Sequence, residues 1–217
     1  MSFAHIKQLA FPVMSSPRKR PSQQRSQYTY DAVLDAATQL FERAGYAGTT
    51  TNHIAERAGV SIGSLYQYFP NKDAILYGLG ERHVREIITV MSALSERMKE
   101  AAPPLEKSVR LLVNALADLH RQDPRMHRLL YDLAPRTPET AEHLRGVQAL
   151  LAADVEHHLR RLDVGGPDFA LTALLLAESV EAQVHGAVLD PPDPYSTEEI
   201  LEAAIDLIVR GLRPTSA

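Results

Sequence analysis

The sequence predicts an all-α fold of about nine helices, in which a small N-terminal three-helix domain precedes a larger helical domain. Two observations support this prediction. Apolar residues recur at three- and four-residue steps through most of the chain after Asp31, and this spacing places them on one face of a helix. No stretch alternates convincingly between apolar and polar residues, as a half-buried strand would.

The first element is preceded by an arm, which we place at residues 1–26. It is rich in Ser, Pro, Gln and Arg and holds no acidic residue, a composition typical of flexible segments. Met14 begins a more polar stretch and is a second candidate start of the natural protein.

The next elements are a helix that ends at Gly45 and a second helix over about 51–58. Gly45 serves as a left-handed cap, and the hydroxyls of Thr49, Thr50 and Thr51 supply N-caps for the second helix. One face of the first helix is apolar: Val33, Leu34, Ala37, Leu40, Phe41 and Ala44.

A third, short helix follows the break at Gly59. Ser61 caps it, and it runs through Tyr68. Pro70 and Asn71 end it and cap a fourth helix over about 72–98. The remaining helices are separated by Pro or Gly-Pro segments and are expected at about 105–122, 125–133, 138–162, 167–189 and 197–212.

Composition limits the function classes. The chain has 217 residues, 45% of them hydrophobic, which suffices for a core. It has no cysteine, so we expect no disulfides and a cytoplasmic location. No apolar run approaches the ~18 residues of a membrane span, so no membrane partner is expected.

The charge is unevenly distributed along the chain. The net charge is −4, but residues 1–80 hold eight Lys/Arg and five acids, so the acidic excess lies entirely in residues 81–217. Because residues 1–80 are basic, a nucleic-acid partner is compatible with the sequence despite the negative net charge of the whole chain.

The segment Thr50–Phe69 reads TTNHIAERAGVSIGSLYQYF and has the pattern of a helix-turn-helix. Gly59 allows positive φ in the tight turn. Ile54, Ala58, Val60 and Leu65 are spaced to bury the junction. The exposed face of the third helix is then short, polar and aromatic, as expected of a helix whose N-terminal end enters a major groove.

Around this segment, residues 30–79 resemble the N-terminal domain of the tetracycline-repressor (TetR) family. The matching stretches are AATQLFERAGY (36–46), TTTNHIAERAGVS (49–61) and GSLYQYFPNKDAIL (63–76). The resemblance implies a DNA-binding regulator, most simply a repressor released from a palindromic operator by a small molecule. Residues 27–80 would form the DNA-binding domain and residues 81–217 a ligand-binding and dimerisation domain, although the latter carry no motif of their own.

The resemblance also implies which residues contact double-stranded DNA. They are Thr50, Thr51, Asn52, Ser61, Ile62, Gly63, Ser64, Tyr66, Gln67, Tyr68 and Lys72. Ile62 is a departure, because an apolar side chain contacts a thymine methyl but forms no hydrogen bond with a base edge. Gln67 is then the long amide on this helix that can pair with adenine.

Several of these residues have a second interpretation that the sequence leaves open. Tyr66 and Tyr68 are core aromatics in the alternative, and Lys72 is a solvated residue of a first helical turn. The basic cluster Arg18-Lys19-Arg20 either follows the minor groove, as basic arms can, or lies in a solvated tail.

A sensor domain needs an apolar cavity with a few polar anchors. Candidate ligand-binding residues lie on the middle helices: His120, Met126, His127, Leu130, Tyr131, Glu178 and Gln183. In the alternative interpretation these are ordinary core or surface residues. The effector is an unspecified small molecule.

The last two helices, expected at 167–189 and 197–212, carry apolar residues on more than one face. A helix that is apolar on two sides needs two partners, and the second is expected to be the same region of another subunit in a homodimer. A large monomeric core is the alternative.

An enzyme is not expected, because the chain carries no GxSxG, HExxH, P-loop or GxGxxG motif. Three carboxylate–His pairs stand four residues apart, at Glu139/His143, Asp154/His158 and Glu181/His185. A metal site needs a third convergent group, so neither a metal nor a cofactor is expected. Two other functions remain open: an activator of the same fold, and a helical interaction module without DNA binding.

Overall fold

The computed structural model describes residues 24–133 and 138–213, and within these ranges the regular structure is entirely helical, which confirms the predicted fold class. The helices are α1 (Gln24–Gly48), α2 (Thr51–Ala58), α3 (Ile62–Tyr68), α4 (Lys72–Ala101), α5 (Leu105–Gln122), α6 (Pro124–Leu133), α7 (Pro138–Leu162), α8 (Phe169–Leu189) and α9 (Thr197–Leu212).

The first helix differs from its prediction at both ends. It begins at Gln24, so residues 24–26, expected in the flexible arm, form its first turn. Gly45 has the expected positive φ of 70°, but the chain kinks there and helical structure resumes to Gly48. The Thr49 hydroxyl donates to the carbonyls of Gly45 (2.9 Å) and Leu40 (3.2 Å), which satisfies carbonyls that the kink would otherwise leave open. The basic cluster at 18–20 lies outside the described residues.

The chain divides into two compact units, of which the first comprises residues 1–84 and 125–143. Its core is built by α1, α2, α3 and the start of α4, around the fully buried Phe69 and Leu34. A Cβ at Gly78 would come within 3.0–3.2 Å of Tyr30, Phe69 and Leu34, so this glycine lets α4 pack closely on α1. Residues 125–143 group with this unit, whereas the sequence suggested a simple boundary between residues 80 and 81.

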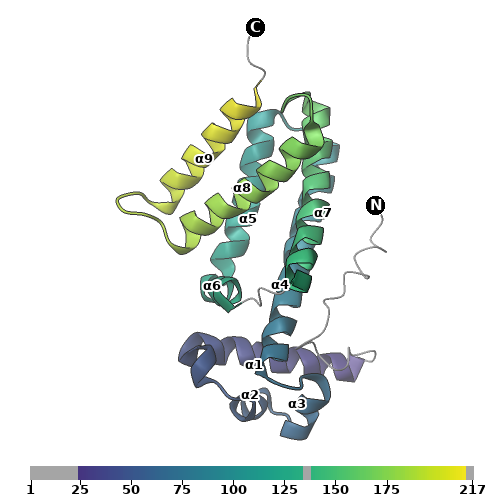
Figure 1. The fold of residues 1–217 in the computed structure, drawn as a ribbon, viewed down its shortest axis with the longest axis vertical. Helices are drawn as coiled ribbons and strands as arrows, with labels where there is room; N and C mark the ends of the chain where they lie inside the picture. Colours follow the sequence, from purple (N-terminus) through teal and green to yellow (C-terminus); the bar gives the residue numbers. More distant parts are fainter. Residues whose placement is uncertain (1–23, 134–137, 214–217) are drawn as a thin grey trace. The chain divides into compact units, whose positions relative to one another are not determined.

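The second unit comprises residues 85–124 and 144–217. Helices α5, α8 and α9 pack on one another (Figure 1) around Val113, Val184 and Ile205. The Asp168 side chain accepts from the Leu171 amide and starts α8. Ser196 and Glu199 form a capping box that starts α9. Both caps satisfy amides that have no partner within the helix.

Helix α4 contributes residues 72–84 to the first unit and residues 85–101 to the second. No helix of the part of the chain described here has the length and hydropathy to cross a bilayer.

Candidate DNA-binding site

Helix α2 begins at Thr50, as its sequence predicts. The Thr50 side chain accepts a hydrogen bond from the His53 amide at 3.2 Å. At the other end Gly59 adopts the left-handed conformation (φ 68°, ψ 28°), and its N–H and the turn that follows close the helix. Ile54 and Ala55 are buried, so the opposite face of α2, with Asn52 and His53, is exposed.

Helix α3 begins at Ser61, whose side chain accepts from the Ser64 amide at 3.0 Å. The two serine hydroxyls also lie 2.8 Å apart. Leu65 is fully buried, which fixes the rotation of the helix against the core. The residues left exposed on α3 are Ile62, Gly63, Tyr66 and Gln67. They share a short face with polar, apolar and aromatic character, as the sequence predicted.

Thr51 and Tyr66 join the two helices at their exposed side. The Tyr66 hydroxyl lies 3.1 Å from the Thr51 hydroxyl, and the Tyr66 side chain is 40% exposed. Two residues expected to contact phosphate therefore lie together, fifteen positions apart in sequence. One of the two protons is used within this pair, so the hydroxyl that accepts keeps its own proton for a phosphate oxygen.

Tyr68 occupies a different environment from Tyr66. Its side chain is 8% exposed, and its ring meets the Tyr30 ring edge-on, with centroids 6.1 Å apart. This position favours the second of the two interpretations, in which Tyr68 is a core aromatic that supports α3 from behind.

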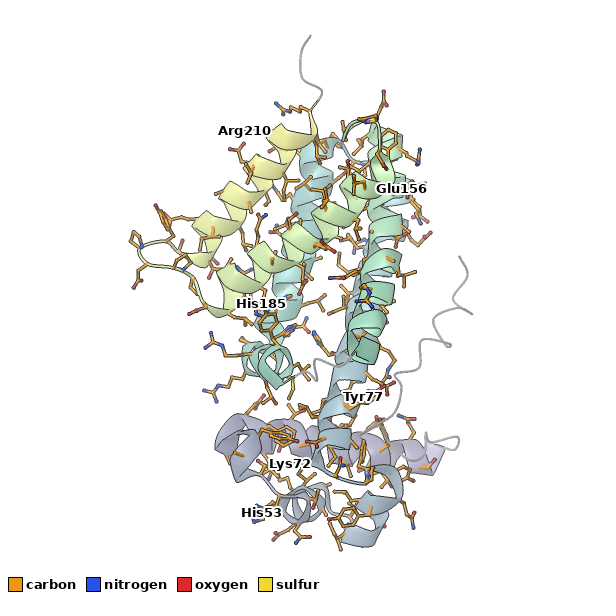
Figure 2. The ribbon with its side chains drawn as sticks, in the orientation of Figure 1. His53, Lys72, Tyr77, Glu156, His185 and Arg210 are labelled. Atoms are coloured by element: carbon orange, nitrogen blue, oxygen red, sulfur yellow. The ribbon has the colours of Figure 1, made fainter. Side chains whose placement is uncertain are left out.

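Lys72 is half-buried and has protein partners. Its ammonium donates to the carbonyls of Tyr46 (2.5 Å) and Thr49 (2.9 Å) and lies 4.1 Å from the centre of the Tyr46 ring. From the start of α4, where Figure 2 labels it, Lys72 thus ties this helix to the segment that leads into α2. An ammonium group has three N–H donors, so one remains for a further acceptor.

Tyr46 is a participant that the sequence did not single out. Its hydroxyl donates to the Asp73 carboxylate. Burial raises the pKa of Tyr46 above its ordinary value, and the hydrogen bond to Asp73 and that residue's negative charge act in the same direction. The phenol is therefore a neutral donor that ties the last turn of α1, beyond the kink at Gly45, to the start of α4. A lone Tyr after Gly45 gave no signal of this role, because Asp73 is distant in sequence.

The candidate ligand-binding residues fall in both units. His120, Glu178 and Gln183 belong to the second unit, whereas residues 126–131 belong to the first. Met126 and Leu130 pack against the first unit's core. The ring of the buried His127 meets the His83 ring edge-on, with the two ring centroids 4.1 Å apart. Tyr131 is 65% exposed, and Glu178 is also exposed.

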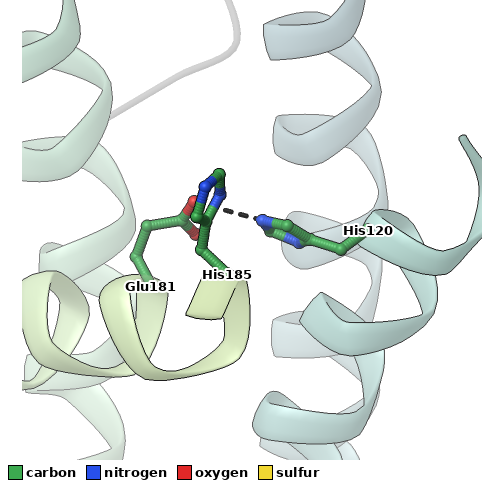
Figure 3. Close-up of side chains that lie close together, drawn as sticks. All are labelled: His120, Glu181 and His185. Carbon is green, nitrogen blue, oxygen red and sulfur yellow. Dashed lines mark ion pairs between the residues drawn. The ribbon is translucent and has the colours of Figure 1, made fainter. Parts of the chain in front are cut away.

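His120 lies with one of the carboxylate–His pairs noted in the sequence. Glu181 and His185 stand one turn apart on α8 and point toward His120 of α5 (Figure 3). The Nε2 atom of His120 is 3.4 Å from Glu181 Oε1. Burial lowers the pKa of His120, but hydrogen bonding to Glu181 and the charge of that carboxylate outweigh burial, so the pKa is raised overall. His120 is the third convergent group that the sequence did not reveal.

The other two pairs do not form such a cluster among the side chains the structure describes. Asp154 faces Lys99 at 3.6 Å, whereas His158 Nε2 lies 3.4 Å from the Ser95 hydroxyl. The side chains of Glu139 and His143 lie outside the described residues.

Two protein-family models together match most of the chain. Residues 33–77 match the model for bacterial regulatory proteins of the tetR family. Residues 104–211 match a tetracyclin repressor-like C-terminal domain. The second match identifies the helical region in which the sequence offered no motif.

Individual proteins extend the likeness over nearly the whole length. The HTH-type transcriptional regulator RutR of Escherichia coli K12 is 28% identical over 198 residues, which span 84% of this chain and 90% of RutR. The solved structure of the fatty acid degradation regulator FadR from Bacillus halodurans superposes with a TM-score of 0.64 at 21% identity and covers 91% of this chain and 100% of that chain.

A second solved structure is the transcriptional regulator FadR from Bacillus subtilis in complex with stearoyl-CoA. It matches with a TM-score of 0.59 at 22% identity and covers 85% of this chain and 100% of that one. At these identities the structures establish the shared fold, and the two family matches establish the family. The chain therefore belongs to the tetR family of bacterial regulatory proteins and is a DNA-binding transcriptional regulator.

Proposed function

We propose that this chain is a cytoplasmic repressor that binds a palindromic operator as a homodimer and is released from it by a small molecule. The observation that carries the DNA-binding part is the exposed face of α3. Leu65 turns inward and leaves Ile62 and Gly63 outward in the first turn of a capped helix, with Gln67 outward near its C-terminal end. A helix presented in this way fits a major groove.

The contact residues divide into two kinds. Thr50, Thr51, Tyr66 and the helix amides near Ser61 suit phosphate oxygens, and the remaining N–H of Lys72 adds a cation to the same backbone. Base edges would be contacted by Asn52, Ser64 and Gln67, and a thymine methyl by Ile62. Gly63 allows close approach of the backbone. Tyr68 contributes by fixing α3 from the core.

A homodimer is supported by an apolar face on the last two helices. Leu171, Leu174 and Leu175 of α8 are 53%, 37% and 56% exposed, and Leu207 of α9 is 66% exposed. Monomeric proteins rarely expose contiguous apolar patches of this kind. A second copy of α8 and α9 would cover them and form a four-helix interface. Two helix-turn-helix segments about one helical turn of DNA apart would then match a palindrome.

Release by a small molecule is proposed to act through α4. This helix contributes its first half to the DNA-binding unit and its second half to the other unit. A ligand that prefers one position of α4 shifts the population between DNA-binding and released states. RutR and the two FadR proteins are themselves named as regulators, which supports regulation here without identifying the effector.

Selection of bound duplexes from a random DNA pool tests the proposal. We expect enrichment of a palindrome whose half-sites are about 10 base pairs apart, centre to centre. Tyr66→Phe should weaken binding to the selected duplex, because it removes a phosphate-facing hydroxyl. Tyr195→Phe is the matched control, since Tyr195 is 60% exposed and lies in the second unit. Failure to enrich any sequence would contradict DNA-binding function. Stronger expression from a reporter when the protein is present would contradict repression.

A further inference from the structure

We propose that His120, Glu181 and His185 bind a divalent transition-metal ion, with zinc(II) as the best fit. One ligand atom from each residue lies within 4.8 Å of the other two. Two imidazoles and one carboxylate form a ligand set that zinc accepts in proteins, with a fourth position left for water or another donor. The site lies wholly within the second unit.

His120 is held in the tautomer that a metal requires. Its Nδ1 lies 2.9 Å from the Leu116 carbonyl oxygen. A carbonyl only accepts, so Nδ1 carries the proton and donates. When a metal ion displaces the proton of Nε2, the lone pair of the neutral ring resides on that atom, which faces Glu181. A ligating histidine ordinarily donates its other ring N–H in this way, which fixes the orientation of the ring.

The distance between ligand atoms suits a tetrahedral ion. Zinc–nitrogen and zinc–oxygen bonds of about 2.1 Å at tetrahedral angles place neighbouring ligand atoms about 3.4 Å apart. His120 Nε2 and Glu181 Oε1 are 3.4 Å apart. Glu181 and His185 are four residues apart on α8, so their side chains lie on one face. The ligand atom of His185 lies within 4.8 Å of the other two, and rotation of its side chain on ion binding would complete the spacing.

The site combines a rigid ligand with accessible ones. His120 is 1% exposed, whereas the Glu181 side chain is 46% exposed and His185 is half-buried. An ion can therefore enter from the Glu181 side and meet a preorganised imidazole. It would join α5 to α8, and because the ligands come from two packed helices, metal binding should stabilise the fold of this unit.

A plain histidine–carboxylate ion pair is the competing explanation for the cluster. It predicts that Glu181→Gln changes stability equally with and without metal. The metal proposal predicts a difference between the two conditions. The metal proposal does not depend on the identity of the operator or of the effector.

The experiment uses the full chain without an affinity tag, treated with a chelator and then dialysed. Zinc(II) is titrated against a competing indicator, and bound zinc is measured by elemental analysis. We expect one zinc per chain in the wild type. Glu181→Gln and His185→Gln should each weaken binding by at least about tenfold, since loss of even a hydrogen-bonding partner of a ligand typically costs about 10- to 100-fold. Zinc should raise the Tm of the wild type and leave that of Glu181→Gln nearly unchanged.

Cobalt(II) supplies a second readout. Bound in this site, it should give the intense visible absorption of a four-coordinate ion, and this absorption should be lost in Glu181→Gln. His157→Gln is the matched control, because His157 is an exposed histidine outside the cluster. The Glu181 side chain is about half exposed, so its variant should fold even if that of the buried His120 does not. Absence of stoichiometric zinc in the wild type, or equal zinc affinity in Glu181→Gln, His185→Gln and His157→Gln, would overturn the proposal.

Discussion

Gln67 is the residue of α3 that most directly links side-chain chemistry to operator sequence. It is exposed on the same helix face as Ile62 and Gly63, and its amide can donate to and accept from adenine. The neighbouring Ile62 offers only apolar contact. Specificity for an A·T pair should therefore depend on Gln67, and we expect the hydroxyls of Thr51 and Tyr66 to contact the DNA backbone whatever the base sequence.

Replacing Gln67 with Ala should weaken binding to the selected operator by about 1–3 kcal/mol and relax the preference at one base pair. Titration of labelled operators, each carrying one changed base pair, measures both effects. Gln122→Ala is the control, because Gln122 is exposed at the end of α5. A uniform loss across all operator variants would show that Gln67 contacts phosphate and not a base.

His158 is a second residue whose surroundings determine a measurable property. Burial is the main cause that lowers its pKa to about 4. The positive charges of Arg161, His157 and Lys99 act in the same direction, against the weaker effect of Asp154. Between pH 6.5 and 4 the unfolded chain therefore binds a proton at this position that the folded chain does not. The free energy of unfolding must fall as the pH falls through this range.

His158→Gln removes this titration and should flatten the fall in stability on acidification. The wild-type contribution approaches about 3 kcal/mol near pH 4, at 1.36 kcal/mol per pKa unit. Urea unfolding at several pH values between 7.5 and 4.5 measures the slope. His53→Gln serves as the control, since His53 is exposed and belongs to the first unit. Parallel slopes for wild type and His158→Gln would refute the assignment.

At the scale of the element, the turn between α2 and α3 depends on one backbone conformation. Gly59 has φ 68°, and a Cβ there would meet no heavy atom within 4 Å. Any cost of a side chain at this position is therefore conformational and not steric crowding with neighbours. Gly186, inside α8, is equally uncrowded but has no positive φ, so the same substitution should act in opposite directions at the two sites.

Gly59→Ala should lower the free energy of unfolding by about 1–2 kcal/mol, because an L-residue is strained in the left-handed region. Gly186→Ala should raise it by about 0.5–1 kcal/mol, because alanine restricts the unfolded chain and favours helix. Chemical denaturation of the two variants beside the wild type measures the difference. If both variants shift in the same direction, backbone conformation is not the dominant effect.

The helices themselves were largely predictable, because their ends carry local signals. Thr50, Gly59, Ser61 and the prolines mark boundaries within one or two residues of those observed. The continuation of α1 beyond Gly45 was not predictable in this way. It depends on Thr49 bonding back to Leu40, a contact that closes only in the folded chain.

The site was predictable where its residues are neighbours in sequence and less so where they meet across the fold. The exposed face of α3 follows from helical periodicity once Leu65 is assigned to the core. Burial of Tyr68 depends on Tyr30, and the position of Lys72 depends on the carbonyls of the loop before α2. The convergence of His120 with Glu181 and His185 required the packing of α5 on α8, which no local pattern encodes.

For the whole molecule, the exposed leucines of α8 and α9 make association the property to test. Leu175→Glu should shift the protein from dimer to monomer in light scattering at micromolar concentration, because a carboxylate in the covered face would be buried without a partner. Loss of the dimer should also lower the affinity for the operator, because two separate monomers would then have to bind the two half-sites. Val90→Glu is the control, because Val90 is 39% exposed and lies on α4. A wild-type monomer would rule out the interface.

The hydroxyl pair of Thr51 and Tyr66 has a consequence for the thermodynamics of association. In the free protein each hydroxyl already restricts the rotamer of the other. Immobilising a side chain at an interface costs about 0.5–1.5 kcal/mol. For these two residues that entropy is lost when the chain folds and not when the complex forms. Operator binding should therefore carry a smaller entropic penalty than two freely rotating hydroxyls would impose.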